Sequence, residues 1–466
     1  MRFRATGAPA IPALLLLVVG LLSPARSAEF RAGAAKRVIT PDLERHYPIF
    51  IAGFGQNRKA TAIHDDLFVR CLAVGTGGRP LVMCGVDSIG LFLDDTELIR
   101  KQAVESLGAP ADIVVASLHD HEAPDTMGLW GPGPGQSGLL EEYNAHVVTM
   151  AAEAAVEAVK QMRPATPRLL TVTDPELTTF IDDSRPPVVQ DPDLIVLSVS
   201  DRSGKHIATL LNWANHPEAT GSSNTEISAD YPAGLYRRFE QRLGGVVVLI
   251  NGAVGGMQSP LGATVNDELT GGSIQKAGFR MAEIIGRRVA DLACDALAKH
   301  KAAVKIGRIE FKRKQIEIPL ANERFLQASQ AGVFKGRKKA TAEGNIATAV
   351  GLIRFWDAGK PVLEAALVPG ELYPELSLGG IQRYEGADYP DAPFEPAIKK
   401  MMSAPYRMLF GLADDEIGYI IPKVEWDAEQ PWLQNASKRW YGEVNSPGPE
   451  TAPRITGALA ELLKER

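Results

Sequence analysis

Short apolar runs alternate along the chain with amphipathic stretches. The runs predict buried strands over residues 67–74, 80–86, 113–118, 194–200, 207–213 and 246–250, the first two forming a hairpin around the glycine-rich residues 75–78. Apolar and polar residues alternate with a period of two over residues 306–318, which predicts a strand with one solvent-exposed face. Helical spacing predicts helices over residues 96–106, 139–162 and 272–300. This mixture predicts an α/β or α+β enzyme core, and we expect α/β with mixed sheets flanked by helices.

The first 27 residues have the pattern of a cleavable signal peptide. Arg2 and Arg4 precede the twelve-residue apolar run 11–22, and Ala25 and Ser27 supply small residues before a cleavage site. A helix of twelve residues covers about 18 Å, whereas the hydrocarbon layer is about 30 Å thick. We therefore expect export, with cleavage after Ser27, a secreted or periplasmic protein, no transmembrane anchor after cleavage, and one large domain over residues 28–466.

Composition excludes several classes of protein. Hydrophobic residues make up 45% of the chain and charged residues 23%, which argues against disordered, collagen-like and coiled-coil proteins. The formal charge is −6 and no basic run stands out, so nucleic acid is not an expected partner. No protein partner is predicted. Three cysteines cannot form a disulfide framework. Cys71 and Cys84 flank the expected hairpin and could pair, but we favour the interpretation that both, with Cys294, are small buried side chains.

Candidate chemistry begins where the predicted strands end. His119 and His121 follow the run 113–118, and two residues this far apart can face one cavity. Neutral imidazoles suit zinc, although a polar loop with two satisfied histidines is an equal alternative. A metallo-β-lactamase site needs HxHxDH, and position 124 is proline. His216 likewise follows the strand ending at Trp213.

Two further segments come after apolar runs. Ser259 ends the glycine-rich loop 251–260, which matches neither a phosphate loop nor a nucleophile elbow, so a tight turn remains an alternative. Glu371 follows the apolar run 365–368 and could instead complement a helix dipole.

These segments in order resemble the catalytic domain of the neutral/alkaline, non-lysosomal ceramidase family, from about residue 34 to about residue 449. The family's THTHSGP segment is matched by LHDHEAP (118–124), its NW…H segment by NWANH (212–216), and its GDVSP loop by GGMQSP (255–260). Its PGE turn is present at residues 369–371, and its tyrosine-rich stretch is similar to YIIPKVEW (419–426) and YGEVNS (441–446).

The resemblance implies a set of site residues and a reaction. It places Zn²⁺ ligands at His119, His216, Glu371 and Tyr419, and catalytic roles at His121 (proton transfer), Ser259, Arg185 (contact with the scissile amide) and Tyr441. It implies a secreted zinc-dependent hydrolase that acts on linear amide C–N bonds. A zinc-bound hydroxide would attack the carbonyl of an N-acyl amide, either a ceramide-like sphingolipid or a related lipid.

The chain also departs from the family. Asp120 and Glu122 replace threonine and serine around the HxH pair, Met257 replaces the loop aspartate, and the family's C-terminal immunoglobulin-like domain is not expected. Two added carboxylates predict an acidic, polar pocket mouth, and hence short-chain or soluble amides as the preferred substrates. Two alternatives remain open: a related metal hydrolase of a non-lipid ester or amide, and a noncatalytic binding protein.

Overall fold

The computed structural model describes Met1, Gly7 and residues 29–465. The predicted signal peptide at residues 1–27, including its cleavage site, lies outside the described residues apart from Met1 and Gly7, and stays a prediction. Across the part of the chain that is described, no helix combines the length and the apolar character needed to cross a membrane.

An eight-stranded mixed sheet forms the centre of the molecule. Its strands, in spatial order, are β11 (Val246–Asn251), β9 (His206–Trp213), β8 (Asp193–Asp201), β6 (Arg163–Thr173), β1 (Arg31–Val38), β3 (Phe68–Gly75), β4 (Leu81–Val86) and β5 (Asp112–Ser117). The outermost pairs, β11 with β9 and β4 with β5, are parallel, whereas all the neighbours between them are antiparallel. The six strands predicted from apolar runs are confirmed within about one residue at each end.

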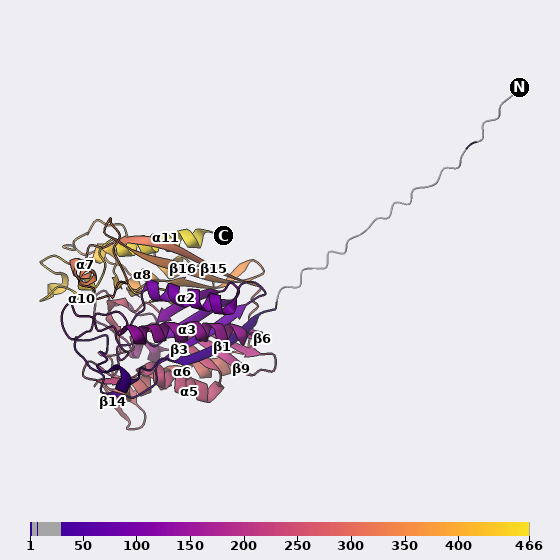
Figure 1. Cartoon of the computed structure of the whole chain (residues 1–466), viewed down its shortest axis with the longest axis horizontal. Helices are drawn as coiled ribbons and strands as arrows, with labels where there is room; N and C mark the ends of the chain where they lie inside the picture. Colours follow the sequence, from indigo (N-terminus) through magenta and orange to yellow (C-terminus); the bar gives the residue numbers. More distant parts are fainter. Residues whose placement is uncertain (2–6, 8–28, 466) are drawn as a thin grey trace.

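Helices cover this sheet in two groups (Figure 1). The helices α2 (Leu93–Leu107) and α3 (Glu141–Lys160) bury one apolar core against β1, β3 and β4. The helices α5 (Tyr231–Leu243) and α6 (Phe279–Lys299) bury another against β8, β9 and β11. The predicted helix over residues 272–300 is wrong in its first turns. Residues Gly272–Ile274 pair instead as strand β14 with β13 (Val265–Asp267), and the helix begins only after Gly278.

A second sheet lies over the opposite side of the central one. It orders β15 (Arg308–Pro319), β16 (Asn345–Asp357), β17 (Lys360–Leu367) and β19 (Tyr406–Phe410), which confirms the strand predicted at 306–318. The two sheets enclose a shared apolar core, and α11 (Thr451–Lys464) packs on β15 and β16 at the top of Figure 1. The predicted α/β arrangement of mixed sheets flanked by helices is therefore confirmed.

Two-residue strands and short helices complete the chain and carry much of the site. Parallel β18 (Glu371–Leu372) pairs with β20 (Tyr419–Ile420), and antiparallel β12 (Gln258–Ser259) pairs with β7 (Asp182–Asp183). The remaining elements are α1 (Leu43–His46), β2 (Ala62–Ile63), α4 (Pro175–Thr179), β10 (Glu226–Ile227), α7 (Glu323–Gln330), α8 (Pro374–Leu378), α9 (Ile398–Met401), α10 (Tyr441–Val444) and the 3₁₀ turns η1 (Gly255–Met257), η2 (Lys423–Glu425) and η3 (Leu433–Asn435).

The cysteines correct the sequence-based interpretation. Cys71 on β3 lies directly opposite Cys84 on β4, and the two are joined by a disulfide with their Cα atoms 4.1 Å apart. The preference for unpaired thiols was wrong because spacing along the sequence does not reveal the register that puts the two residues face to face. Cys294 is buried and free, as expected.

Candidate active site

His119 stands just beyond the end of β5, in a conformation that few residues adopt. Its φ of 61° lies in the left-handed region, where a side chain such as histidine is strained unless its surroundings hold it. Its Nδ1 is 2.7 Å from the carbonyl oxygen of Ile89, so Nδ1 carries the proton and donates. The opposite ring nitrogen, Nε2, is thereby left as a lone-pair donor.

His216 repeats this arrangement at the end of β9. Its Nδ1 is 2.7 Å from the carbonyl oxygen of Gln258, the first residue of β12. Its Nε2 lies 3.1 Å from Oε2 of Glu371, and Nε2 of His119 lies 3.4 Å from the same oxygen. The fold therefore brings the predicted residues His119, His216 and Glu371 together around Oε2 of Glu371.

Glu371 and Tyr419 reach this point from paired strands. They lie opposite each other in the β18–β20 pair, and their side chains are hydrogen-bonded. The strands approach closely because Gly370 has no side chain: a Cβ at that position would lie 2.5 Å from the carbonyl oxygen of Gly418. Although burial opposes ionisation, the neighbouring His119 and His216 lower the pKa of Glu371, which favours the carboxylate.

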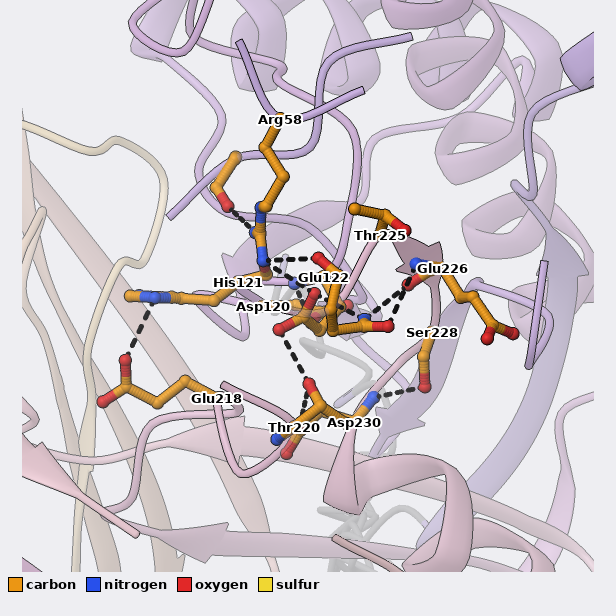
Figure 2. Close-up of polar contacts among 12 residues, drawn as sticks. Arg58, Asp120, His121, Glu122, Glu218, Thr220, Thr225, Glu226, Ser228 and Asp230 are labelled. Carbon is orange, nitrogen blue, oxygen red and sulfur yellow. Dashed lines mark hydrogen bonds and ion pairs between the residues drawn. The ribbon is translucent and has the colours of Figure 1, made fainter. Parts of the chain in front are cut away.

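His121 turns its ring toward the same place. Ligand atoms of His119, His121 and His216 all lie within 4.8 Å of one another, and all three side chains are buried. Gly53 makes room for the ring, since a Cβ there would lie 2.3 Å from Cγ of His121. On its other side, Nδ1 of His121 is 3.1 Å from Oε2 of Glu218 (Figure 2). Among the described residues, neither Nδ1 nor Nε2 of His121 has a well-aligned hydrogen-bond partner, so its contact with Glu218 is a close approach of the two groups.

The donor set suits a metal such as zinc. Burial lowers the pKa of His119 to about 4, which keeps its imidazole neutral and able to bind a metal at pH 7. His119 and His216 each hold the other ring nitrogen on a backbone carbonyl, the usual support for a metal-binding histidine. Imidazole nitrogens and a carboxylate oxygen are ligands that Zn²⁺ accepts. His121 brings a third imidazole to the same place.

An apolar cavity of about 450 Å³ opens onto these residues. His119, His121, Glu218, Glu371 and Tyr419 line it together with a larger apolar group: Phe54, Phe92, Met127, Leu129, Trp130, Leu261, Leu320, Phe325, Phe334, Ile346 and Ile417. A mostly apolar wall with a few convergent polar groups is typical of a small-molecule site.

Tyr441 also lines the cavity, as the resemblance implied. It begins helix α10, and its ring meets that of Tyr419 edge-on with the centroids 5.8 Å apart. Desolvation, together with the negative charges of Glu371 and Glu218, raises the pKa of Tyr441 to about 12. The hydroxyl therefore keeps its proton near pH 7 and can act as a hydrogen-bond donor.

Ser259 and Arg185 do not appear among the residues that line the cavity. Ser259 lies behind it and is hydrogen-bonded to Glu218. The Arg185 guanidinium is 2.8 Å from each carboxylate oxygen of Glu443 and also donates to the backbone carbonyl of Glu425. Both Nη atoms of Arg185 are thus engaged by Glu443 and Glu425, and its predicted contact with a scissile amide stays a prediction.

The expected acidic pocket mouth is wrong. Asp120 and Glu122 are fully buried and do not line the cavity, because neither side chain follows the histidine rings toward it. Glu122 instead pairs with Arg58, its Oε2 lying 3.0 Å from Nη1 (Figure 2). The sequence showed a change of charge but not the direction in which the side chains point.

Comparisons with known proteins were made by sequence and by structure. No protein-family model and no curated protein sequence matches the chain. Its structure matches neutral ceramidase from Pseudomonas aeruginosa with a TM-score of 0.70 and 16% identity, over 94% of this chain and 74% of that chain. The chain has the fold of neutral ceramidase. The structure also matches a ceramidase complexed with C2, with a TM-score of 0.67 and 14% identity, over 94% of this chain and 74% of that chain.

Proposed function

We propose that the chain is an exported, zinc-dependent hydrolase that cleaves the amide bond of an N-acyl lipid. The observation that carries the proposal is the convergence of three buried histidines and Glu371 at an apolar cavity, within the neutral ceramidase fold. His119, His216, Glu371 and Tyr419 would hold the metal. When bound, zinc supplies Lewis-acid polarisation of a carbonyl and brings the pKa of a bound water to about 7.

His121 is the proposed proton-transfer group. The departing amine needs a proton, and His121 lines the cavity beside the proposed ligands. Glu218 fixes the orientation of the ring through the contact at Nδ1, so that Nε2 is left to exchange a proton with the substrate. Sequence patterns missed Glu218, since a lone glutamate two residues after His216 matches no motif.

Tyr441 would donate a hydrogen bond to the oxyanion that develops on the carbonyl oxygen. Its position depends on α10, and that helix is anchored where Glu443 meets Arg185. Arg185 is thus proposed as a positioning residue. Ser259 has a similar supporting role, because its hydroxyl contacts Glu218 behind the cavity.

The cavity wall favours a lipid substrate. Most of the lining side chains are aromatic or aliphatic, so an acyl chain would be removed from water along much of its length. Each buried methylene contributes about 0.8 kcal/mol. With the acidic mouth corrected, the reason to prefer short or soluble amides no longer stands.

The disulfide between Cys71 and Cys84 supports export. The Cys71–Cys84 disulfide fits an oxidising compartment, whereas cytosolic thiols are kept reduced. The signal-like pattern over residues 1–27 points the same way. Sequencing the N-terminus of the exported protein tests this step, and an intact Met1 would contradict it.

The central experiment measures metal content and substrate range together. Purified protein should contain about one zinc per chain, lose activity when a chelator removes it, and regain activity when zinc is restored. The value of kcat/KM on N-acyl amides in mixed micelles should rise about fourfold per added buried methylene until the cavity is full. Absence of amide hydrolysis at full zinc occupancy would overturn the proposal. Turnover of esters alone, or tight binding without turnover, would indicate one of the two alternative functions.

A further inference from the structure

A buried ion pair lies directly behind His121, on the side away from the cavity lining. Arg58 is 8% exposed and Glu122 is fully buried, with Nη1 and Oε2 3.0 Å apart. Burying such a pair costs solvation free energy, and burial raises the pKa of Glu122 to about 8 even though Arg58 lies beside it. Replacing a buried pair of this kind by apolar residues often leaves a protein equally stable or more stable. Stability alone therefore gives little reason for an ion pair at this position.

Arg58 ties together two loops that shape the site (Figure 2). Its Nη2 donates to the backbone carbonyl oxygens of His121 and Ala52. Its guanidinium carbon also lies 5.0 Å from the centre of the Phe54 ring. The Phe54 ring in turn meets the ring of His121 edge-on, with the centroids 4.8 Å apart. Arg58 thus fixes the backbone of His121 and one wall against which its ring rests.

Glu122 extends the connection to the segment that carries Glu218. It accepts hydrogen bonds from Oγ1 of Thr220 at 2.7 Å and from Nδ2 of Asn224 at 2.8 Å. Oγ1 of Thr220 also lies 3.0 Å from Asp230, whose carboxylate accepts from the backbone nitrogens of residues 219 and 220. The backbone nitrogen of His121 completes the connection by donating to the carbonyl oxygen of Pro217 at 3.0 Å.

We propose that the Arg58–Glu122 pair is a positioning unit that sets the contact between His121 and Glu218. The inference rests on the proposed function, in which that contact orients the proton-transfer group. Glu122 lies in the loop of His121 and binds the loop of Glu218, while Arg58 holds both Glu122 and the backbone of His121. The pair therefore fixes the two loops relative to each other. A shift of about 1 Å in a reacting group can cost about 10²-fold in rate.

The chain offers a matched control for this pair. Arg354 is also buried, lies 2.9 Å from Glu364 through Nε, and donates to two backbone carbonyl oxygens, those of Leu463 and Glu465. It belongs to β16 in the second sheet and does not line the cavity. Arg58→Met and Arg354→Met therefore remove equivalent interactions, but only the first lies beside His121.

Activity per bound zinc is the first measurement. Arg58→Met should lower kcat by about 10²-fold with KM and zinc content unchanged, whereas Arg354→Met should leave kcat per zinc within about twofold of wild type. Glu122→Gln, which keeps the shape of the side chain, should lower kcat in the same direction and serves if Arg58→Met does not fold. If kcat per zinc is the same in the Arg58 and Arg354 variants, or if activity falls only in proportion to bound zinc, the inference is overturned.

A second measurement does not depend on catalysis. In zinc-free protein labelled with ¹⁵N-histidine, the side-chain resonance of His121, assigned by its loss in His121→Gln, should shift or broaden in Arg58→Met but not in Arg354→Met. An unchanged resonance in both would also overturn the inference. If the wild type hydrolyses no amide, the proposed function fails, while this resonance still tests whether the pair positions His121.

Discussion

Nδ1 of His121 and Oε2 of Glu218 lie 3.1 Å apart, and both side chains are buried beside the proposed metal ligands. Although burial opposes ionisation, the contacts of Glu218 with His121, His216 and Ser259 lower its pKa to about 2. An ionised carboxylate beside one nitrogen of a histidine helps to hold the ring in one orientation.

Replacing that carboxylate should separate orientation from metal binding. In Glu218→Gln, the amide keeps the shape but not the charge, so kcat should fall about 10–100-fold, the usual cost of losing a partner of this kind. Zinc content and KM should be unchanged. Glu283→Gln, which alters a half-exposed surface pair, is the control and should keep full activity. Equal activity in the two variants would remove Glu218 from the mechanism.

The roles of the three histidines can be distinguished by metal analysis. His119→Ala and His216→Ala should each lose zinc and activity together, because few ligands share a binding free energy of about 10–16 kcal/mol. His121→Ala should keep most of its zinc while kcat falls about 10²–10⁴-fold, the size of a general acid–base contribution. Metal loss in His121→Ala as large as in His119→Ala would instead make His121 a ligand and put the role of Tyr419 in doubt.

The disulfide should contribute measurably to stability. Closing a loop with a sequence separation of 13 between Cys71 and Cys84 predicts about 3 kcal/mol, mainly through the unfolded chain. Urea unfolding of the Cys71→Ala/Cys84→Ala variant should show this loss, and a reductant should destabilise the wild type but not the variant. Cys294→Ala controls for the loss of a buried sulfur, and its stability should not respond to the reductant.

Acid sensitivity should come in part from His206, far from the metal ligands along β9. Burial, with the positive charge of Arg168 adding to it, lowers the pKa of His206 to about 4. The unfolded chain therefore binds more protons below its pKa of about 6.5, so stability is retained above pH 6.5 and falls as the pH drops toward 4. The loss should reach at most about 3 kcal/mol, and His206→Gln should remove this part of the slope. The exposed His146→Gln should not alter it.

Local patterns predicted the strands well but the boundaries of one long helix poorly. Apolar runs such as 194–200 and 246–250 identify buried strands because such strands are apolar on both faces. Residues 272–274 were assigned to a helix, because the sequence cannot show that they pair with residues 265–267. The same limit explains Cys71 and Cys84, whose bond depends on the register between two strands.

In the candidate site, the sequence predicted positions at strand ends but not side-chain contacts. His119 and His216 were found because each follows an apolar run. Glu218 and Arg58 were missed because their partner, the segment 120–122, lies about a hundred and about sixty residues away in the chain. The ion pair of Arg185 with Glu443 was also missed, because residues 185 and 443 are far apart in the chain.

The pairing of Glu371 with Tyr419 through only two residues of β18 and β20 limits how this protein can vary between species. An added or deleted residue beside either strand would turn one of the two side chains to the opposite face. The close contact between Gly370 and Gly418 leaves no space in which the backbone could shift to compensate. Within the 46 residues between the strands, residues 379–405 lie outside this pairing. Natural insertions and deletions should therefore accumulate inside residues 379–405 and stop short of both glycines.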